Sequence, residues 1–119
     1  QGLTQAQFDD LPEAGEIDPF LIRFSEKIIS LDFQKGGLVK DMADGLKSGK
    51  VLAKDVQRVR IVTKGGKVYT LDNRRLKAFQ MAGVKVRYQK LDHIPKRQLF
   101  KFKTENDGAD VEWGGMMER

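Results

Sequence analysis

The chain has 119 residues, of which 33% are charged, with a formal net charge of +5 and no cysteine. This length allows one small domain with a modest core and excludes two independent domains. The lack of cysteine excludes disulfides, thiolate nucleophiles and cysteine zinc sites. No apolar run approaches the ~20 residues that span a bilayer, so we expect no membrane anchor. The positive charge favours a polyanionic partner such as nucleic acid.

Residues 1–19 are predicted to be a linker or N-terminal extension, and residues 20–119 to be a single domain. The first segment is acidic, contains two prolines and has little periodicity, apart from one short turn expected around residues 4–11. It begins at Gln1 with neither an initiator Met nor a signal sequence. We therefore expect a piece of a longer protein.

Apolar residues between positions 20 and 29 predict buried strand or extended structure around Arg23, Phe24 and Ser25. The Ser25 hydroxyl would either cap a turn or contact a phosphate. A Gly-Gly break follows at positions 36 and 37. Leu38, Met42 and Leu46 then recur at every fourth residue, which predicts an amphipathic helix over residues 38–47 with this stripe facing the core.

Alternation over residues 58–62 predicts a strand with Arg58 and Arg60 on one face, and a Gly-Gly hairpin turn at positions 65 and 66 leads into a second strand. A later strand over residues 84–88 places Lys85 and Arg87 on one face. These four basic residues either share a sheet face that contacts phosphate or are edge-strand charges that discourage aggregation. Further strands are expected at residues 98–103 and 109–113.

Polar residues mark the junction at which the second strand ends and a helix begins. Asp72 or Asn73 suits the helix N-cap, an apolar stripe follows over residues 76–82, and Gly83 suits the helix end. Arg74 and Arg75 would then lie in the first helical turn, where free N–H groups and the positive end of the helix dipole favour an anion. This position predicts a phosphate or carboxylate partner for the two arginines.

Residues 70–83 read TLDNRRLKAFQMAG. This segment closely resembles the TLDNRRL.AF..AG box of ParB-like nuclease domains, which lie at the C-terminal ends of bacterial polymorphic toxins of the Rhs and contact-dependent inhibition types. It more distantly resembles the phosphate-binding box of ParB partition proteins, whose corner begins with Gly where this chain has Asp72. The resemblance extends from about Arg23 to Gln89. It implies an α+β domain of the ParB/sulfiredoxin kind, with a small mixed sheet and packed helices, although sulfiredoxin chemistry needs a cysteine that this chain lacks.

The resemblance further implies a nuclease toxin that cleaves phosphodiester bonds of DNA or RNA in competitor bacteria. Such a domain is secreted as part of a larger effector, acts in the cytoplasm of the target cell and is neutralised in the producer by an immunity protein, which we expect to be acidic. Two alternatives remain: a non-catalytic nucleotide- or DNA-binding module, and a nucleotide-dependent phosphotransferase. Nothing in the residues distinguishes DNA from RNA.

The expected catalytic residues are Asp72, Asn73, Arg74, Arg75 and His93. Asp72 would cap the helix, act as a general base or orient an arginine, and the arginines would bind phosphate and stabilise charge that develops during cleavage. Asn73 would add a neutral donor. His93 suits proton transfer at neutral pH but lies outside the box, where it is alternatively a turn residue.

The residues expected to contact phosphate are Arg23, Ser25, Arg58, Arg60, Lys77 and Arg87. No metal-ligand motif is visible, and Asp41 and Asp44 are interpreted as solvated helix charges. We therefore expect no resident metal. Mg²⁺ carried in by substrate phosphates is compatible with the sequence, because this ion often uses only one or two protein carboxylates.

Overall fold

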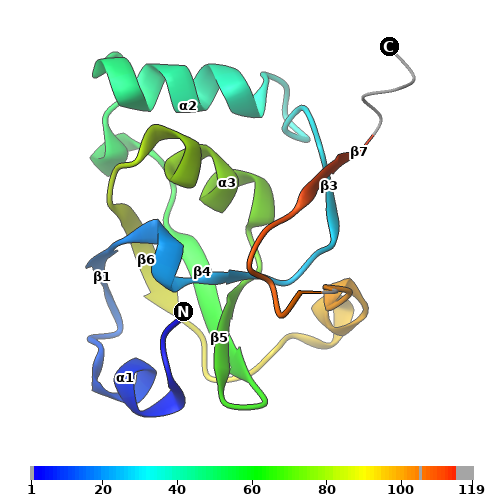
Figure 1. Cartoon of the computed structure of the whole chain (residues 1–119). Coiled ribbons are helices and arrows are strands. Elements are labelled where there is room, and N and C mark those ends of the chain that lie inside the picture. Colours follow the sequence, from blue (N-terminus) through cyan, green and yellow to red (C-terminus); the bar gives the residue numbers. More distant parts are fainter. Residues whose placement is uncertain (1, 105, 115–119) are drawn as a thin grey trace.

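The computed structural model describes residues 2–104 and 106–114 and shows an α+β domain built on a mixed five-stranded sheet (Figure 1). In chain order the helices and strands are α1 (Gln5–Asp10), β1 (Ala14–Ile17), β2 (Arg23–Phe24), β3 (Ile28–Ser30), α2 (Val39–Ser48), β4 (Val59–Lys64), β5 (Lys67–Thr70), α3 (Asn73–Ala82), β6 (Val86–Lys90) and β7 (Glu112–Gly114). Short 3-10 turns are η1 (Pro19–Leu21), η2 (Ala53–Asp55) and η3 (Lys96–Lys101).

The main sheet has the strand order β1-β6-β4-β5-β2, so β4 is the central strand. β4 pairs antiparallel with β5 and parallel with β6, and the short β2 pairs parallel with β5. β3 and β7 form a separate parallel pair. Helix α3 packs against α2, which lies above it in Figure 1. The predicted α+β class with a mixed sheet and packed helices is confirmed at this level.

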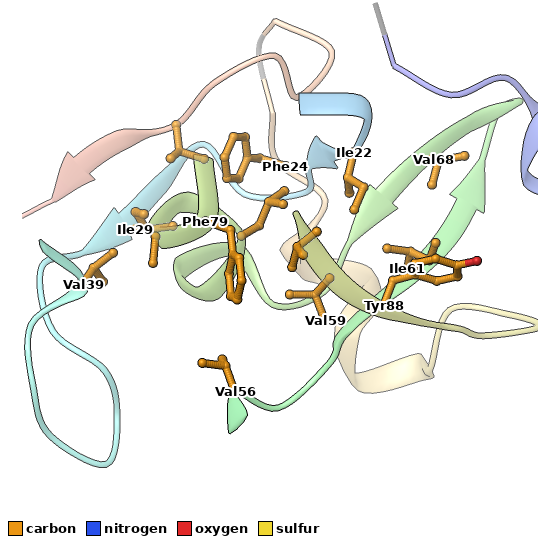
Figure 2. Packing of buried hydrophobic residues seen from close by; sticks show 14 of the residues in the cluster. Ile22, Phe24, Ile29, Val39, Val56, Val59, Ile61, Val68, Phe79 and Tyr88 are labelled. Carbon is orange, nitrogen blue, oxygen red and sulfur yellow. The ribbon is translucent and has the colours of Figure 1, made fainter. Parts of the chain in front are cut away.

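The β4–β5 hairpin forms as the sequence predicts, with small differences in its bounds. Gly65 and Gly66 both have positive φ, 60° and 79°, which is the backbone of a type I′ turn and suits the twist of the two strands. Val59 and Ile61 alternate with Arg60 and are buried in the core. They join Phe24, Phe79 and Tyr88 in one cluster of buried side chains (Figure 2).

Both predicted helices are present, and α3 has the predicted bounds. Leu76 and Phe79 are buried, and Gly83 ends the helix in the left-handed conformation with φ 70°. The predicted stripe of α2 is confirmed at Leu46, is only partly buried at Met42, and is wrong at Leu38. The helix begins at Val39 with Leu38 as its N-cap, so Leu38 lies outside the helical face and is 45% exposed, while Val39, Ala43 and Leu46 are buried.

The interpretation of residues 1–19 as an irregular linker was wrong. The turn expected near residues 4–11 is helix α1, closed by a reciprocal capping box between Thr4 and Gln7, and β1 pairs antiparallel with β6 at one edge of the main sheet. A Cβ at Gly15 would lie 3.1–3.3 Å from atoms of the Tyr88 ring. The glycine that looks like a linker residue therefore allows an aromatic ring to pack against the strand.

The segment before β2 and the segment after β6 also differ from expectation. Phe20 was expected to be buried, but Pro19 opens the turn η1 and Phe20 is exposed; Ile22 and Phe24 are buried as expected. The strand predicted over residues 98–103 is wrong, because the chain forms η3 directly after Pro95 and then makes a backbone bond from Lys103 N–H to the Ser25 carbonyl. The strand predicted over residues 109–113 exists as the shorter β7.

Among the described residues, no helix has the length and apolar character needed to cross a membrane.

Candidate functional site

A pocket of about 570 Å³ opens where β5 ends and α3 begins. It is lined by side chains from the β2–β3 connection, the loop before α2, the segment from α2 to β4, and the first turn of α3. Its basic residues are Lys35, Arg60, Arg74 and Arg75, its acidic residues are Glu26, Asp55 and Asp72, and its apolar residues include Phe33, Met42 and Val51. Four of the five residues predicted to be catalytic thus lie at one pocket.

Thr70 shapes the corner that enters this pocket. Its fully buried hydroxyl accepts the backbone N–H of Asp72 at 3.0 Å and donates to the carbonyl of Arg60 at 3.0 Å. The chain therefore turns from β5 into α3 while it stays bonded to the central strand β4. This geometry directs the Asp72 side chain toward Arg60.

Asp72 is the most heavily bonded carboxylate of the pocket. Its Oδ2 accepts the backbone N–H of Arg60 at 2.8 Å and Arg60 Nε at 3.0 Å, while Oδ1 accepts Arg60 Nη2 at 2.8 Å. Arg75 Nη1 lies 3.4 Å from Oδ2. Burial raises the pKa of the Asp72 carboxyl, but the hydrogen bonds from Arg60 and the charges of Arg75 and Arg60 outweigh it, so the pKa is lowered from its ordinary value.

Asp72 occupies the N-cap position of α3 without capping the helix through its side chain, because the carboxylate is directed to Arg60. The N–H groups of the first turn therefore have no side-chain cap, and they belong to residues that line the pocket. Free N–H groups and the positive end of the helix dipole attract anions. The start of α3 is thus suited to a negatively charged ligand.

Buried hydrogen bonds between Asn73 and Ser25 join α3 to the β2–β3 connection. Asn73 Oδ1 accepts the backbone N–H groups of Ser25 at 2.8 Å and Glu26 at 3.3 Å, and its Nδ2 donates to Ser25 Oγ at 3.0 Å and Glu26 Oε1 at 3.2 Å. Asn73 is 3% exposed and Ser25 is fully buried. All four bonds are internal, so Asn73 and Ser25 position the pocket wall.

The two arginines of the first turn are each anchored through one terminal nitrogen. Arg74 Nη1 donates to Ser30 Oγ at 3.1 Å and to the Asp32 carbonyl at 3.0 Å, while Arg75 Nη1 donates to the Arg58 carbonyl at 3.1 Å. Within residues 2–104 and 106–114, neither Nε nor Nη2 of either side chain donates to protein. Each guanidinium thus keeps donors for a ligand in the pocket.

Arg60 lines the pocket but is paired with Asp72. The other basic residues predicted to contact phosphate do not line the pocket. Arg58 Nη1 donates to the carbonyls of Gly15 at 3.2 Å and Tyr88 at 3.3 Å and so joins β1 to β6. Arg23 Nη1 donates to the Asp107 carbonyl at 2.9 Å, and Lys77 Nζ pairs with Asp110 at 3.0 Å. The Nε atoms of Arg23 and Arg87 are buried without a protein partner in the described part of the chain.

The structure also bears on the two interpretations of the basic strand residues. β4 and β6 are internal strands of the sheet, so the edge-charge interpretation was wrong for Arg60 and Arg87, while Arg58 and Lys85 lie just before these strands. His93 is exposed and follows β6, which runs parallel to β4 toward the hairpin end of the sheet, opposite the junction. His93 does not line the pocket, and the structure does not bring it to the other predicted catalytic residues.

Sequence reasoning missed five polar residues that line the pocket, namely Glu26, Gln34, Lys35, Asp55 and Gln57. Glu26 directly follows the predicted Ser25, but its contact with Asn73 spans 47 residues and has no local sequence signal. Lys35 precedes the Gly-Gly break, which identifies it only as a loop residue.

The described residues contain no cluster of three or more His, Cys, Asp or Glu side chains that could hold a metal ion. The chemistry that the pocket offers is recognition of an anion by guanidinium groups and helix N–H groups, with carboxylates beside it. Comparisons with family models, with curated proteins and with solved structures found no match for this chain.

Proposed function

We propose that this domain is a ParB-like nuclease that binds a phosphodiester group of DNA or RNA in the junction pocket and cleaves it. The observation that carries the proposal is the meeting of three anion-binding features in one pocket. The first is the N-terminus of α3, which has no side-chain cap. The second and third are the guanidinium donors of Arg74 and of Arg75 that are not bonded to described residues. The resemblance of residues 70–83 to the toxin box supports the same assignment.

The arginines supply the electrostatic part of the mechanism. A guanidinium held through Nη1 keeps its remaining donors in a fixed plane, and such a fork binds two phosphate oxygens at once. Negative charge that accumulates on these oxygens during cleavage is then stabilised by donors that are already in position. Asp72 acts through Arg60 and Arg75, which it orients.

Asp72 itself is a poor proton acceptor. Its two oxygens already accept three hydrogen bonds from Arg60, and its lowered pKa makes the carboxylate a weak base. We therefore assign it a positioning role rather than the general-base role. Asn73, whose amide is fully used inside the protein, is likewise a positioning residue.

The toxin context follows from the same resemblance. We infer a domain that is secreted as part of a larger effector and that acts in the cytoplasm of a competitor bacterium. Its cognate immunity protein is acidic and covers the junction pocket, because complementary charge accelerates association and occupation of the pocket blocks the polyanion. A tight natural inhibitor with net positive charge would count against this partner chemistry.

A second candidate is a nucleotide- or nucleic-acid-binding module without catalysis. The placement of His93 outside the pocket and the saturation of Asp72 favour it, because they remove two of the expected proton-transfer groups from the site. Binding without turnover requires only the arginines and the helix N-terminus.

One experiment separates these candidates. Purified protein is incubated with plasmid DNA, with total bacterial RNA and with labelled ATP or CTP, each with and without Mg²⁺. The nuclease proposal expects cleavage of DNA or RNA, which Arg75→Ala abolishes and Lys40→Ala, on the exposed face of α2, leaves unchanged. Saturable binding without any product would favour the module, and transfer of labelled phosphate would favour the phosphotransferase.

A further inference from the structure

We propose that Glu26 is the general base of the pocket, the carboxylate that accepts the proton of the attacking water during phosphodiester cleavage. This inference rests on the proposed nuclease function and names a catalytic residue within the same pocket. Glu26 lies in the β2–β3 connection and lines the pocket together with Arg74 and Arg75. It approaches from a chain segment distant in sequence from the arginine-bearing turn of α3.

The Glu26 carboxylate is held in place by the first residue of α3. Its Oε1 accepts Asn73 Nδ2 at 3.2 Å, and the Glu26 backbone N–H donates to Asn73 Oδ1 at 3.3 Å. Asn73 thus fixes both the backbone and the side chain of Glu26 beside the uncapped end of the helix. A group held next to the expected phosphate position satisfies the geometric requirement for a general base.

Glu26 differs from the other two acids of the pocket in how its oxygens are used. Asp72 has three bonds from Arg60 and an ion pair with Arg75. Asp55 is an exposed residue of η2 whose carboxylate has no hydrogen-bond partner among the described residues, so nothing there fixes its position. Among residues 2–104 and 106–114, no Lys or Arg nitrogen lies within ion-pair distance of Glu26, and only its Oε1 is hydrogen bonded. Glu26 therefore combines a fixed position with a free oxygen.

The step balances without any further reactant. The water oxygen bonds to phosphorus while its proton passes to a Glu26 oxygen, the bond from phosphorus to the leaving oxygen breaks, and that oxygen takes up a proton from solvent. Glu26 then releases its proton to solvent. One water is consumed, and its elements are divided between the two products.

Glu26→Gln tests the assignment because glutamine keeps an acceptor oxygen for Asn73 but cannot accept the proton. We measure single-turnover cleavage at saturating protein on whichever of plasmid DNA and total RNA the wild type cuts. In parallel, binding of labelled DNA and RNA oligonucleotides is measured across a salt series. Glu16→Gln, an exposed glutamate of β1 outside the pocket, is the matched control with the same change in charge.

The expected result is a loss of ~10²–10⁴ in cleavage rate for Glu26→Gln, with oligonucleotide affinity and salt slope retained, and no change for Glu16→Gln. Unaltered cleavage by Glu26→Gln overturns the assignment, and so does a loss confined to Asp55→Asn. Weakened binding that parallels the loss in rate also overturns it, since a base acts on the chemical step. If the wild type cuts neither nucleic acid, the proposed function itself fails.

Discussion

Helices α2 and α3 have the same length and the same kind of end, but they begin in opposite ways. Each has ten residues and ends at a left-handed glycine, Gly49 with φ 85° and Gly83 with φ 70°. The first turn of α2 contains Asp41, whose negative charge interacts favourably with the positive end of the helix dipole. The first turn of α3 contains two arginines and no acid. The main difference lies at the N-terminal ends, although α2 also has Lys47 in its last turn, where α3 has no basic residue.

The charges of the two helices are also satisfied over different distances. In α2, Lys40 pairs with Asp44 one turn away, and both side chains are more than 60% exposed. In α3, Arg75 has a local ion pair with Asp72, but Arg75 and Arg74 also bond to residues 17 and 42–44 positions away. Asn73 bonds to a residue 48 positions away. The start of α3 therefore joins several distant segments around a pocket, while α2 is a packing helix with solvated charges. The predictions below test this contrast.

The largest effect is expected for Arg74→Lys and Arg75→Lys on catalysis. A lysine has one nitrogen, which cannot hold the protein anchor and bind two phosphate oxygens at once, so cleavage at saturating protein should fall by ~10²–10³. Lys40→Ala on α2 should leave the rate unchanged. If both arginine variants cut at the wild-type rate and alter only the salt dependence of binding, the arginines are electrostatic anchors and not catalytic groups.

Asn73→Ala should give the largest loss of stability. It removes the acceptor of the buried Ser25 N–H and the donor to Ser25 Oγ, and unsatisfied buried polar groups cost ~1–3 kcal/mol each. We expect the free energy of unfolding to fall by about 3 kcal/mol in guanidinium denaturation. Leu38→Ala at the N-cap of α2 affects an exposed residue with no capping side-chain bond and should cost less than half as much. Equal losses would remove the contrast between the helix starts.

Asp72→Asn should lower the free energy of unfolding by about 2 kcal/mol. Loss of a charged partner from a buried pair costs ~3–5 kcal/mol, and the 40% exposure of the Arg60 side chain reduces this through solvent screening. Because the pKa of Asp72 is lowered in the folded protein, its contribution is complete above the ordinary carboxyl pKa of about 3.9 and is lost as pH falls through the lower folded value.

The gap in stability between wild type and Asp72→Asn should therefore close below about pH 4, which denaturation at a series of pH values measures. Asp41→Asn in α2, at an exposed acid whose carboxylate has no hydrogen bond among the described residues, serves as the control with the same change in charge and should cost less than about 1 kcal/mol. A gap that stays constant down to low pH would show that the charge of Asp72 is not what stabilises the corner.

The smallest predicted loss of stability is at the glycines that end the two helices, and it should be equal in α2 and α3. Gly49 and Gly83 each have positive φ and open space where a Cβ would lie, so Gly49→Ala and Gly83→Ala should each cost about 1 kcal/mol from backbone strain alone. Thermal unfolding of the two variants provides the comparison. A much larger loss at Gly83 would mean that the helices differ at both ends.

The sequence predicted α3 and the β4–β5 hairpin because their signals are local. Helical periodicity, a terminal glycine and a Gly-Gly turn act within a few residues, and all three determine the same structure here. β1 could not be predicted from local signals, because it pairs with β6 far along the chain and its Gly15 lies close to the Tyr88 side chain. The η3 segment was misread for a related reason, because an apolar-basic run resembles a strand whether or not a sheet edge is available to it.

The site was predictable in part. The Asp72–Arg75 junction was identified from its residue types, but the partners of its side chains were not, because Arg60, Ser25 and Glu26 reach it only through the tertiary fold. His93 was selected for the chemistry of its imidazole, and residue type alone does not place a side chain in a pocket. The role of Asp72 depended on Arg60, a residue read at first as a phosphate contact.

The contacts of the segment before β7 have a consequence for the order of folding. The Gly108 carbonyl accepts the N–H of Phe24, and Arg23 donates to the Asp107 carbonyl 84 residues later. Such contacts close large loops and form slowly, whereas the hairpin and α3 are contiguous and can assemble early. During synthesis, Asn73 can hold Glu26 as soon as α3 has formed, whereas the bonds that attach β2 to residues 107 and 108 form only after this late segment has left the ribosome. The nascent chain would therefore expose all of its pocket-lining residues, which end at Arg75, before it contains the last buried residue of its core, Val111.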